Sequence, residues 1–497
     1  MNLQTLLLVI GSVAIVLTLI VGLIMKGHKS WLMTYLQNFC GSFYIFSGWV
    51  KAVDPMGMGF KIADYFTAFE SVLSGTWFSF LAPLFPFLSQ YQIGISMFVI
   101  IFEIVLGIML IMGHRPKLLS WMFFILLLFF TVLTGFTFLT GYVPPDVNFF
   151  QFGQWGAFKE TNQQVTDCGC FGDFIKLKPK VSFFKDLALM LPALFFLFKH
   201  KDMHQLFTKG IRDLIVIVSI IGLIIYCLSN FVWDIPHADF RPFKVNTNVR
   251  EQKAIEMKAL ADVDITGWEF TNSKTGEVAS IMNPDYMAIY KSYPKEEGWV
   301  VDQIKSEPTL VPSKISEFEI VNTDGYDQTE GILNDPNYSL MIVSYKMKGN
   351  GSEEAQGTYL DTIMTLDTLE TTDADGNFIV EESIQNIQEK SYTFTDYKWD
   401  ESFVDDYTSI IKPFAEKARA DGLKTYAVVG GAGAEQLEDF KEELGLGLEM
   451  YTADDILLKT IVRSNPGIVL WKDGRIINKW HKKKLPSYEE VKQEFMK

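Results

Sequence analysis

Long apolar runs that few polar residues interrupt dominate the first half of the chain. A helix of about 20 apolar residues is long enough to cross the hydrocarbon core of a bilayer. Six runs approach or exceed this length, and the pattern therefore predicts six membrane-spanning helices. They cover residues 3–25, 31–50, 92–113, 118–141, 183–198 and 214–233.

The first run, residues 3–25, has a cleaved signal peptide as its alternative. No Lys or Arg precedes this run, and it is longer than the apolar part of a signal peptide. Lys26-Gly-His-Lys29 follows it, where a cleavage site would carry small residues. We therefore expect a retained first span.

Residues 77–88 are also apolar, but the stretch is short and contains two prolines, which indicates an interfacial or re-entrant segment rather than a seventh span.

Lys and Arg are concentrated in three of the predicted loops. Short loops rich in these residues stay in the cytoplasm, and six spans put all three loops on the same side. This predicts a multi-pass protein of a bacterial inner membrane, with both termini and loops 51–91 and 142–182 in the periplasm. Lysines between positions 176 and 185 favour the opposite side, but that arrangement would conflict with all three basic loops. Those loops carry Lys26, Lys29, Arg115, Lys117, Lys199, Lys201, Lys209 and Arg212.

Charge is distributed unevenly along the 497 residues, whose net charge is -15. Residues 1–234 hold 15 of the 44 Lys and Arg and 12 of the 59 Asp and Glu, which leaves 29 basic and 47 acidic residues in the second half. Nucleic acids and anionic lipid headgroups attract clustered Lys and Arg. The acidic second half therefore argues against either as its partner.

Beyond position 234 the apolar runs give way to the alternating and helical patterns of a soluble domain. We interpret residues 1–234 as a membrane domain, 235–312 as a linker with a small mixed region, and 313–497 as a periplasmic domain. The predicted fold class is a membrane all-α helical bundle of about six spans, followed by a periplasmic α/β domain that resembles thioredoxin.

The resemblance to thioredoxin rests on the order strand, helix, strand, helix, hairpin, helix. An insertion is expected between the first strand and the long helix, in residues 346–357 and 361–390, with a turn at Asp375-Gly376. The predicted elements are strand 339–347, helix 401–421, strand 424–429, helix 434–444, strands 468–471 and 475–480, and helix 487–496.

Asn465-Pro466 precedes the predicted hairpin, where thioredoxin-like folds place a cis-proline. The second hallmark, Cys-x-x-Cys after the first strand, is missing, because no Cys follows Cys227. A domain without a thiolate cannot exchange disulfides. We therefore predict that Asn465 and Pro466 bind an extended peptide or a protein partner; the alternative is a structural proline in a degenerate domain.

The predicted loop 142–182 contains Asp167-Cys168-Gly169-Cys170. Two cysteines that flank one glycine can join only through a small strained ring, and strain makes a disulfide more oxidising. Asp167 would raise and nearby lysines would lower a thiol pKa, so the sequence does not fix the thiolate character. Three uses stay open for the pair, namely redox exchange, a structural bridge and metal binding, and we predict no metal because ligands are few.

Glu103 lies near the middle of its predicted span. A carboxylate at this depth is costly unless it is protonated or paired, so it marks a candidate proton site, with Lys51 as a counter-charge. The alternative is a neutral Glu that is hydrogen-bonded between helices. A quinone is the candidate electron acceptor beside Glu103.

The motif Cys-Gly-Cys-Phe-Gly, followed by Lys-Pro-x-x-Ser-Phe-Phe-Lys-Asp-Leu, resembles the MauE family of membrane proteins. Residues 41–51, with Glu103, Gly107 and Gly113, resemble the pattern of the related DoxX family. Fusion to a thioredoxin-like domain without cysteines resembles an architecture found in Bacteroidota. The resemblance implies disulfide formation or maturation of an exported protein, with Cys168 and Cys170 as the redox pair.

The expected function is therefore thiol–disulfide handling in the periplasm, in which Cys168 and Cys170 exchange with exported proteins and pass electrons to a quinone or another membrane partner. The alternative is a non-enzymatic accessory or scaffold subunit of an envelope export or assembly complex, whose C-terminal domain binds partners. In both cases the expected partners are the lipid bilayer, exported or periplasmic proteins and other inner-membrane subunits, and not nucleic acid.

Overall fold

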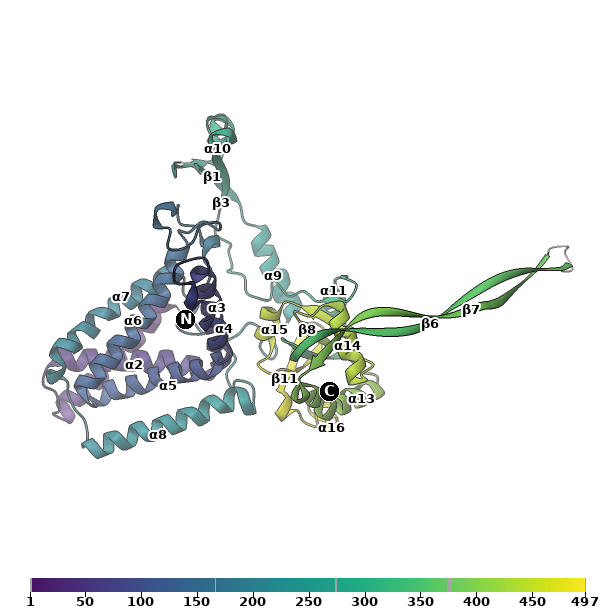
Figure 1. The fold of residues 1–497 in the computed structure, drawn as a ribbon. Coiled ribbons are helices and arrows are strands. Elements are labelled where there is room, and N and C mark those ends of the chain that lie inside the picture. The colour runs from purple at the N-terminus through teal and green to yellow at the C-terminus, as the bar shows by residue number, and fades with distance from the viewer. Residues whose placement is uncertain (1, 166, 273–274, 373–377, 497) are drawn as a thin grey trace. The chain divides into compact units, whose positions relative to one another are not determined.

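The structure of the chain is a computed structural model that describes residues 2–165, 167–272, 275–372 and 378–496 (Figure 1). The chain forms two compact units. The first unit comprises Met1–Phe318 together with two short segments from the C-terminal part, Thr460–Ser464 and Lys479–Lys484. The second unit comprises Glu319–Lys459, Asn465–Asn478 and Leu485–Lys497.

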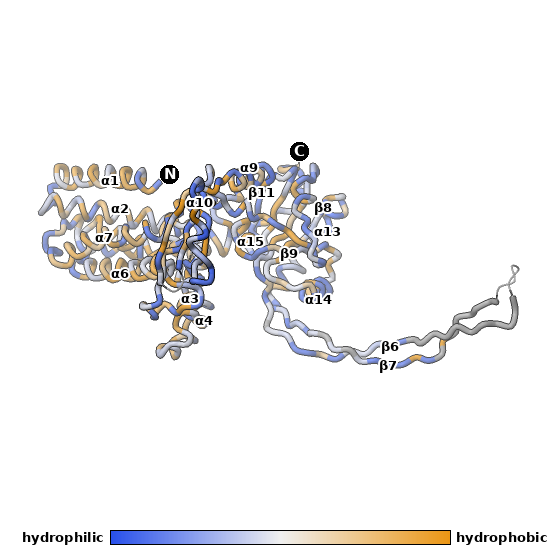
Figure 2. The backbone as a smooth tube through the Cα atoms, turned by 90° about the horizontal axis from the view of Figure 1, so that it is seen from above, coloured by the Kyte–Doolittle hydropathy of each residue, from blue (hydrophilic) through white to orange (hydrophobic). Residues whose placement is uncertain are grey.

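The first unit begins with a bundle of helices whose residues are largely apolar (Figure 2). Within the described residues, five helical segments are long and apolar enough to cross a membrane: Leu3–Ile24, Gln92–Met112, Pro116–Thr140, Pro179–Asp202 and Lys209–Trp233. The helices are α1 (Leu3–Leu19), α2 (Trp31–Val53), α3 (Pro55–Leu73), α4 (Leu84–Ser89), α5 (Gln92–Met112), α6 (Pro116–Thr140), α7 (Pro179–Lys199) and α8 (Lys209–Leu228).

Five of the six predicted spans are confirmed as helices of sufficient length and apolarity, and the exception is helix α2, which contains residues 31–50. This helix has 23 residues but is less apolar than the other five, because polar residues are buried along it. Gln37 Nε2 donates to the Leu110 carbonyl at 3.1 Å, and Asn38 Nδ2 donates to the Thr18 hydroxyl at 3.1 Å. Helix α2 thus directs its polar groups to neighbouring helices.

The predicted interfacial stretch 77–88 contains a short 3-10 turn, Ser79–Leu81, and helix α4. Together they form an apolar segment that is shorter than a membrane span. This agrees with the prediction that this stretch adds no full crossing.

Helices α2 and α5 approach each other closely at a pair of glycines. A Cβ on Gly41 would lie 2.8 Å from the Gly107 carbonyl oxygen, and a Cβ on Gly107 would lie 2.7 Å from the Gly41 carbonyl oxygen. Small residues allow the backbones of membrane helices to come this close. The contact fixes the distance between the two helices that carry Lys51 and Glu103.

Side chains from the predicted basic loops meet at one end of the bundle. Lys29 donates to the Lys201 carbonyl at 2.8 Å, and Arg115 pairs with Asp213 at 3.2 Å. In a third link, Arg212 donates to the Gly113 carbonyl at 3.1 Å. The three loops therefore lie on the same side of the first unit.

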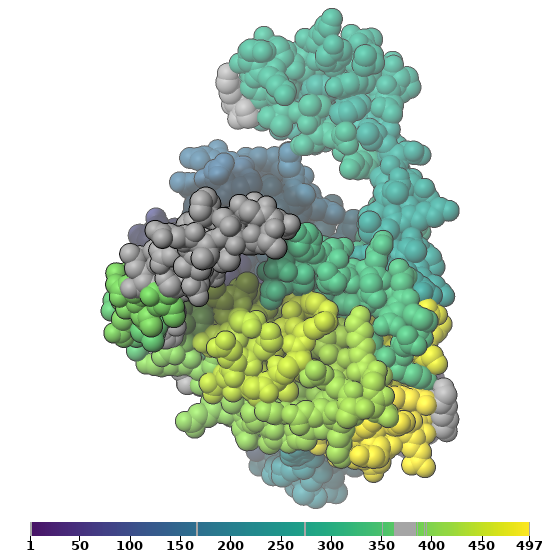
Figure 3. All heavy atoms as spheres, turned by 90° about the vertical axis from the view of Figure 1, so that its right-hand side faces the viewer, coloured from purple at the N-terminus to yellow at the C-terminus, as the bar shows by residue number. Residues whose placement is uncertain are grey.

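A small antiparallel sheet with strand order β2-β1-β3 follows the bundle in the first unit. Phe270, Ile281 and Trp299 form its core. In Figure 3 its residues form a lobe at the top. The elements are α9 (Val249–Ala261), β1 (Ile265–Asn272), β2 (Val278–Met282), α10 (Asn283–Ile289) and β3 (Trp299–Lys305).

The second unit is built on a six-stranded sheet with order β11-β10-β5-β8-β9-β4. Strand β5 is parallel to β8 and antiparallel to β10, and its residues Leu340–Val343 are almost fully buried. The strands are β4 (Val321–Asn322), β5 (Tyr338–Ser344), β8 (Lys424–Gly430), β9 (Glu449–Ala453), β10 (Gly467–Lys472) and β11 (Arg475–His481, whose last three residues belong to the first unit). The helices are α11 (Thr329–Leu333), α12 (Glu401–Asp405), α13 (Lys412–Ala420), α14 (Ala434–Leu444), α15 (Asp455–Ile461) and α16 (Tyr488–Phe495).

The predicted strands and helices of residues 313–497 are present, with two differences. The long helix is interrupted by a π-helical turn at Asp406–Ile411, and strands β4 and β9 with helices α11 and α15 are additional elements. The Asn465–Pro466 peptide bond is cis, as predicted. The structure therefore has a C-terminal mixed α/β region after the helical part.

The predicted insertion is a two-stranded antiparallel ribbon that extends away from the sheet (Figure 1). Its strands are β6 (Gly349–Thr372) and β7 (Phe378–Trp399). The predicted turn at Asp375-Gly376 lies outside the described residues.

The glycine contact between α2 and α5 leads to a first prediction. Gly107→Ala should destabilise the protein by about 1–3 kcal/mol, because the new methyl group overpacks the helix crossing. Gly222→Ala is the matched control: Gly222 lies in α8, where a Cβ would meet nothing within 4 Å. Thermal unfolding in detergent should show a lower melting temperature for Gly107→Ala alone. Equal melting temperatures for the two variants would contradict the close packing.

Candidate functional site

A cavity that is partly open to solvent lies in the first unit, among helices α2, α3, α5, α6 and α7; its empty space, open solvent included, is about 830 Å³. Cys168, Gly169 and Cys170, from the loop between α6 and α7, also line it. Its remaining lining includes Lys51 and Glu103. The structure thus brings together in one cavity the four residues that the sequence singled out for chemistry in the membrane half.

The cysteine loop is fastened to helix α2. The Ser47 hydroxyl donates to the Cys170 carbonyl at 2.9 Å, and the fully buried Phe171 ring packs edge-on against Phe43, with centroids 5.6 Å apart. Gly169 has φ +63°, a left-handed conformation that glycine adopts without steric cost. These contacts hold both cysteines at the cavity.

Cys168 and Cys170 are free thiols in the structure. Burial raises the pKa of Cys168 to about 12, and the neighbouring Tyr65 hydroxyl opposes only part of this rise. Burial also raises the pKa of Cys170, although the charges of Lys185 and Lys51 oppose it. Both groups are therefore protonated at neutral pH, and nucleophilic attack requires the removal of a proton.

Lys51 and Glu103 form an ion pair between α2 and α5 with an Nζ–Oε2 distance of 2.7 Å. Each side chain is only 3% exposed. The ammonium also lies 5.1 Å from the centroid of the Phe130 ring. Lys51 is thus in contact with Glu103, as its predicted role as a counter-charge requires. The pair lines the same cavity as the two thiols.

A second buried ion pair, Lys185 with Asp186, was missed by the sequence analysis as a site feature. Its Nζ–Oδ1 distance is 2.6 Å, and Asp186 Oδ2 accepts a hydrogen bond from Thr134 at 3.0 Å. Lys185 Nζ also lies 5.8 Å from the Phe171 centroid, next to Cys170 in sequence. Adjacent charged residues at the start of an apolar helix were the available signal, since such charges mark functional sites by default.

Aromatic rings make up much of the remaining wall of the cavity. Tyr65 is 4% exposed, and its hydroxyl accepts from Thr137 at 3.0 Å. The other aromatic residues of the wall are Phe43, Tyr44, Phe66, Phe69, Phe129 and Phe130. The cavity therefore suits an apolar or planar ligand that also meets a few polar groups.

Asn465 and Pro466 belong to the second unit and are not among the residues that line the cavity. Asn465 is buried, and its Nδ2 donates to the Lys346 carbonyl at 2.7 Å, which ties the start of β10 to the chain after β5. Their role in partner binding stays a prediction. Among the described residues, no group of three or more His, Cys, Asp or Glu is placed to hold a metal ion.

Comparison with known proteins gives no match to a family, to a curated protein or to a solved structure. The functional argument therefore rests on the cavity and its residues.

The raised thiol pKa leads to a prediction about pH. The thiolate fraction of Cys168, with a pKa of about 12, should increase roughly tenfold per pH unit between pH 7 and pH 10. Alkylation of Cys168 by iodoacetamide, followed by mass spectrometry of its peptide, should therefore accelerate over this whole range. An exposed thiol of ordinary pKa, about 8.5, should reach a plateau in the same experiment. A plateau for Cys168 below pH 9 would contradict the protonated resting state.

Proposed function

We propose that this chain is a membrane thiol–disulfide oxidoreductase that acts on exported proteins. The observation that carries the proposal is the cavity that Cys168 and Cys170 share with the buried pairs Lys51–Glu103 and Lys185–Asp186. Paired thiols supply two electrons and two protons on oxidation, and the two ion pairs offer groups between which protons can move.

The proposed cycle has two half-reactions that balance. In the first, a disulfide between Cys168 and Cys170 oxidises two thiols of an exported protein; one disulfide forms in the client, and both cysteines become thiols. In the second, Cys168 and Cys170 form their disulfide again and release two electrons and two protons. Glu103 and Asp186 would take up and pass on the protons, while Lys51 and Lys185 stabilise the charge on each carboxylate.

The acceptor in the second half-reaction is proposed to be a quinone, which takes up two electrons and two protons to give a hydroquinone. The fit rests on the cavity itself: its apolar wall carries seven aromatic side chains, and its polar groups lie beside the thiols. Phe130 and Phe43 would orient a planar ring, and the ammonium groups of Lys51 and Lys185 are the available donors to its oxygens.

We infer an inner-membrane location with the cysteine loop on the periplasmic side. The meeting of the three basic loops at one end of the bundle supports this orientation, because such loops stay in the cytoplasm. With α2 as a sixth, more polar crossing, the loop that contains Cys168 and Cys170 falls on the opposite side. The DoxX and MauE resemblance of residues 31–200 is in line with this assignment and stays a resemblance.

The second unit is proposed to be thioredoxin-like and to bind the client or a partner. Support comes from the strand order β11-β10-β5-β8, with β5 parallel to β8 and antiparallel to β10. The sequence contains no Cys after Cys227, so this unit cannot exchange disulfides itself. Asn465 and Pro466 remain the candidate binding residues.

The β6–β7 ribbon favours a second candidate function, that of an accessory subunit in an envelope export or assembly complex. An isolated two-stranded ribbon is marginally stable in water and gains stability from a partner. Leu360, Ile384 and Ile387 on this ribbon are 70%, 60% and 53% exposed. In this alternative the cysteines fasten the loop, and the chain recognises proteins without catalysing a reaction.

Thiol trapping in intact cells tests the oxidoreductase directly. The redox state of Cys168 and Cys170 should shift when quinone is depleted, and Cys168→Ser or Cys170→Ser should trap a mixed disulfide with a client on a non-reducing gel. Cys227→Ser is the control, since Cys227 does not line the cavity. A permanently closed bridge without any trapped adduct would instead favour the accessory subunit.

Glu103→Gln tests the proton site. The variant should slow reoxidation of the thiol pair by at least about tenfold, because the amide cannot accept the proton that the step releases. Its stability control is Lys51→Met/Glu103→Gln, which removes the charge of both partners and avoids a buried unpaired ammonium. If Glu103→Gln inserts normally and reoxidises at the wild-type rate, Glu103 has no part in proton transfer.

A further inference from the structure

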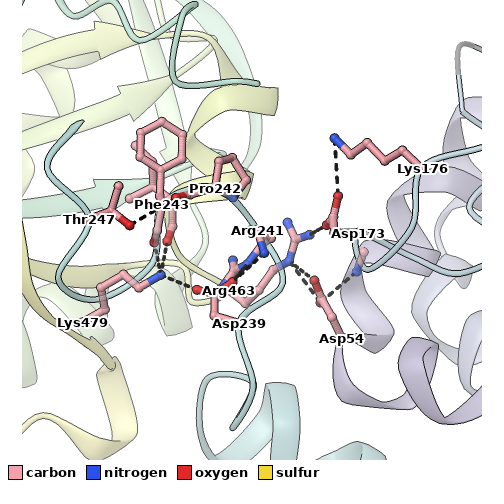
Figure 4. Close-up of polar contacts among 12 residues, drawn as sticks. Asp54, Asp173, Lys176, Asp239, Arg241, Pro242, Phe243, Thr247, Arg463 and Lys479 are labelled. Carbon is pink, nitrogen blue, oxygen red and sulfur yellow. Dashed lines mark hydrogen bonds and ion pairs between the residues drawn. The ribbon is translucent and has the colours of Figure 1, made fainter. Parts of the chain in front are cut away.

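A cluster of six buried or half-buried charged side chains lies beside the α2–α3 junction in the first unit (Figure 4). Arg463 stands between two carboxylates of this cluster. Its Nε donates to both carboxylate oxygens of Asp54, at 3.0 and 2.8 Å, and its Nη2 lies 3.7 Å from Asp173 Oδ2. The Arg463 side chain is 4% exposed and its guanidinium also lies 5.2 Å from the Phe60 centroid.

The other three members of the cluster are Arg241, Asp239 and Lys479. Arg241 donates two hydrogen bonds to the Asp239 carboxylate, from Nε at 2.8 Å and from Nη2 at 3.0 Å. Lys479 donates to Asp239, to the Phe243 carbonyl and to the Ile461 carbonyl. Burial raises the pKa of Asp239, but Arg241 and Lys479 outweigh it and lower that pKa to about 2. Asp239 is therefore ionised at any physiological pH, and its charge holds Arg241 and Lys479 in place.

The two carboxylates that Arg463 joins lie on two different segments of the chain, each of which contributes other residues to the cavity. Asp54 is the N-cap of α3, where it accepts from the Gly57 amide at 3.0 Å, and α3 contributes Tyr65 to the cavity. Asp173 follows Cys170 by three residues in the cysteine loop. One guanidinium thus ties the start of a cavity helix to the loop that carries both thiols.

We propose that Arg463 is a positioning residue for the Cys168–Cys170 loop, which it clamps to the N-terminus of α3 through Asp173 and Asp54. The effect of this clamp on catalysis rests on the proposed function, whereas the existence of the clamp does not depend on it. Arginine suits the task because its planar fork carries several donors and a permanent charge, so that two carboxylates can share it.

Loss of Arg463 should do more than remove an attraction. Asp54 and Asp173 would then face each other with less compensation, and two like charges at close range repel. The loop would move away from α3, and water and reagents would reach Cys168 more often. A buried partner that loses its counter-charge is strongly destabilised, so the effect should be large at the loop.

Lys176 provides a matched control on the same carboxylate. It lies 3.7 Å from Asp173 Oδ1, the same distance at which Arg463 approaches Oδ2, but its side chain is 59% exposed. An exposed pair of this kind contributes little to stability. A clamp that depends on burial therefore requires Arg463 and not Lys176.

The test measures alkylation of individual cysteines in the full-length protein in membranes, with N-ethylmaleimide and mass spectrometry. Arg463→Met should raise the rate at Cys168 roughly tenfold or more, because local opening limits access to a buried group. Lys176→Met should leave the rate unchanged. Cys40 and Cys227, which lie within helices of the bundle, report any general loosening and should stay at the wild-type rate.

A second carboxylate variant makes the test specific to charge. Arg463→Met/Asp173→Asn removes the repulsion along with the arginine and should restore at least half of the protection of Cys168. Arg463→Lys retains one charge without the fork; it should give a smaller increase, and it replaces the methionine variant if that variant does not accumulate. The equilibrium of the Cys168–Cys170 couple with glutathione, measured in parallel, should shift only in variants that open the loop.

An unchanged rate at Cys168 in both Arg463 variants would overturn the proposal, as would an equal increase at Cys227. Alkylation does not require redox activity. A thiol pair that is silent in cells but opens in Arg463→Met would therefore refute the oxidoreductase and retain the clamp, whereas the reverse result would refute the clamp alone.

Discussion

The ion pair between Lys51 and Glu103 is the constraint on which the rest of the membrane half depends. Two charges that are 3% exposed inside an apolar bundle are tolerable only as a pair with good geometry. That geometry requires α2 and α5 to lie close together, which the contact between Gly41 and Gly107 permits. The same requirement explains why α2 is more polar than its neighbours, since its side chains bond to protein rather than face lipid.

Charge also explains why a cavity persists next to this pair. Lys185 and Asp186 form a second ion pair in the lining of the cavity, supported by Thr134. Charged groups cannot be covered by arbitrary apolar packing, because each needs its partner in a fixed direction. The same cavity is lined by seven aromatic side chains and by both thiols. The arrangement favours a ligand that is mostly apolar and exchanges protons.

Sequence reasoning predicted the elements of this protein better than their contacts. Apolar periodicity located the long apolar helices and most strands of the C-terminal region, but helix α3 lies in the predicted loop 51–91 because its polar residues interrupt any long apolar run. The cost of a charge in a membrane singled out Glu103, which the structure pairs with Lys51. The pairing of Lys185 with Asp186 was not predictable in the same way, because two charges at the edge of an apolar run also suit a loop. Arg463 gave no signal at all: its partners, Asp54 and Asp173, are 409 and 290 positions away along the chain, and no local pattern reports such a contact.

The protonated state of the thiols links these features to a mechanism. A surface thiol of ordinary pKa has a reactive thiolate fraction at neutral pH, whereas a pKa of about 12 leaves Cys168 almost fully protonated. Reaction then requires a group that takes up the proton and a geometry that brings the thiol to its acceptor. Buried carboxylates paired with lysines offer the first, and a loop held by Ser47 and Phe171 offers the second. If the chain acts as the proposed oxidoreductase, such a site would be selective because its resting thiols are unreactive, and electrons would leave only when the proposed acceptor occupies the cavity.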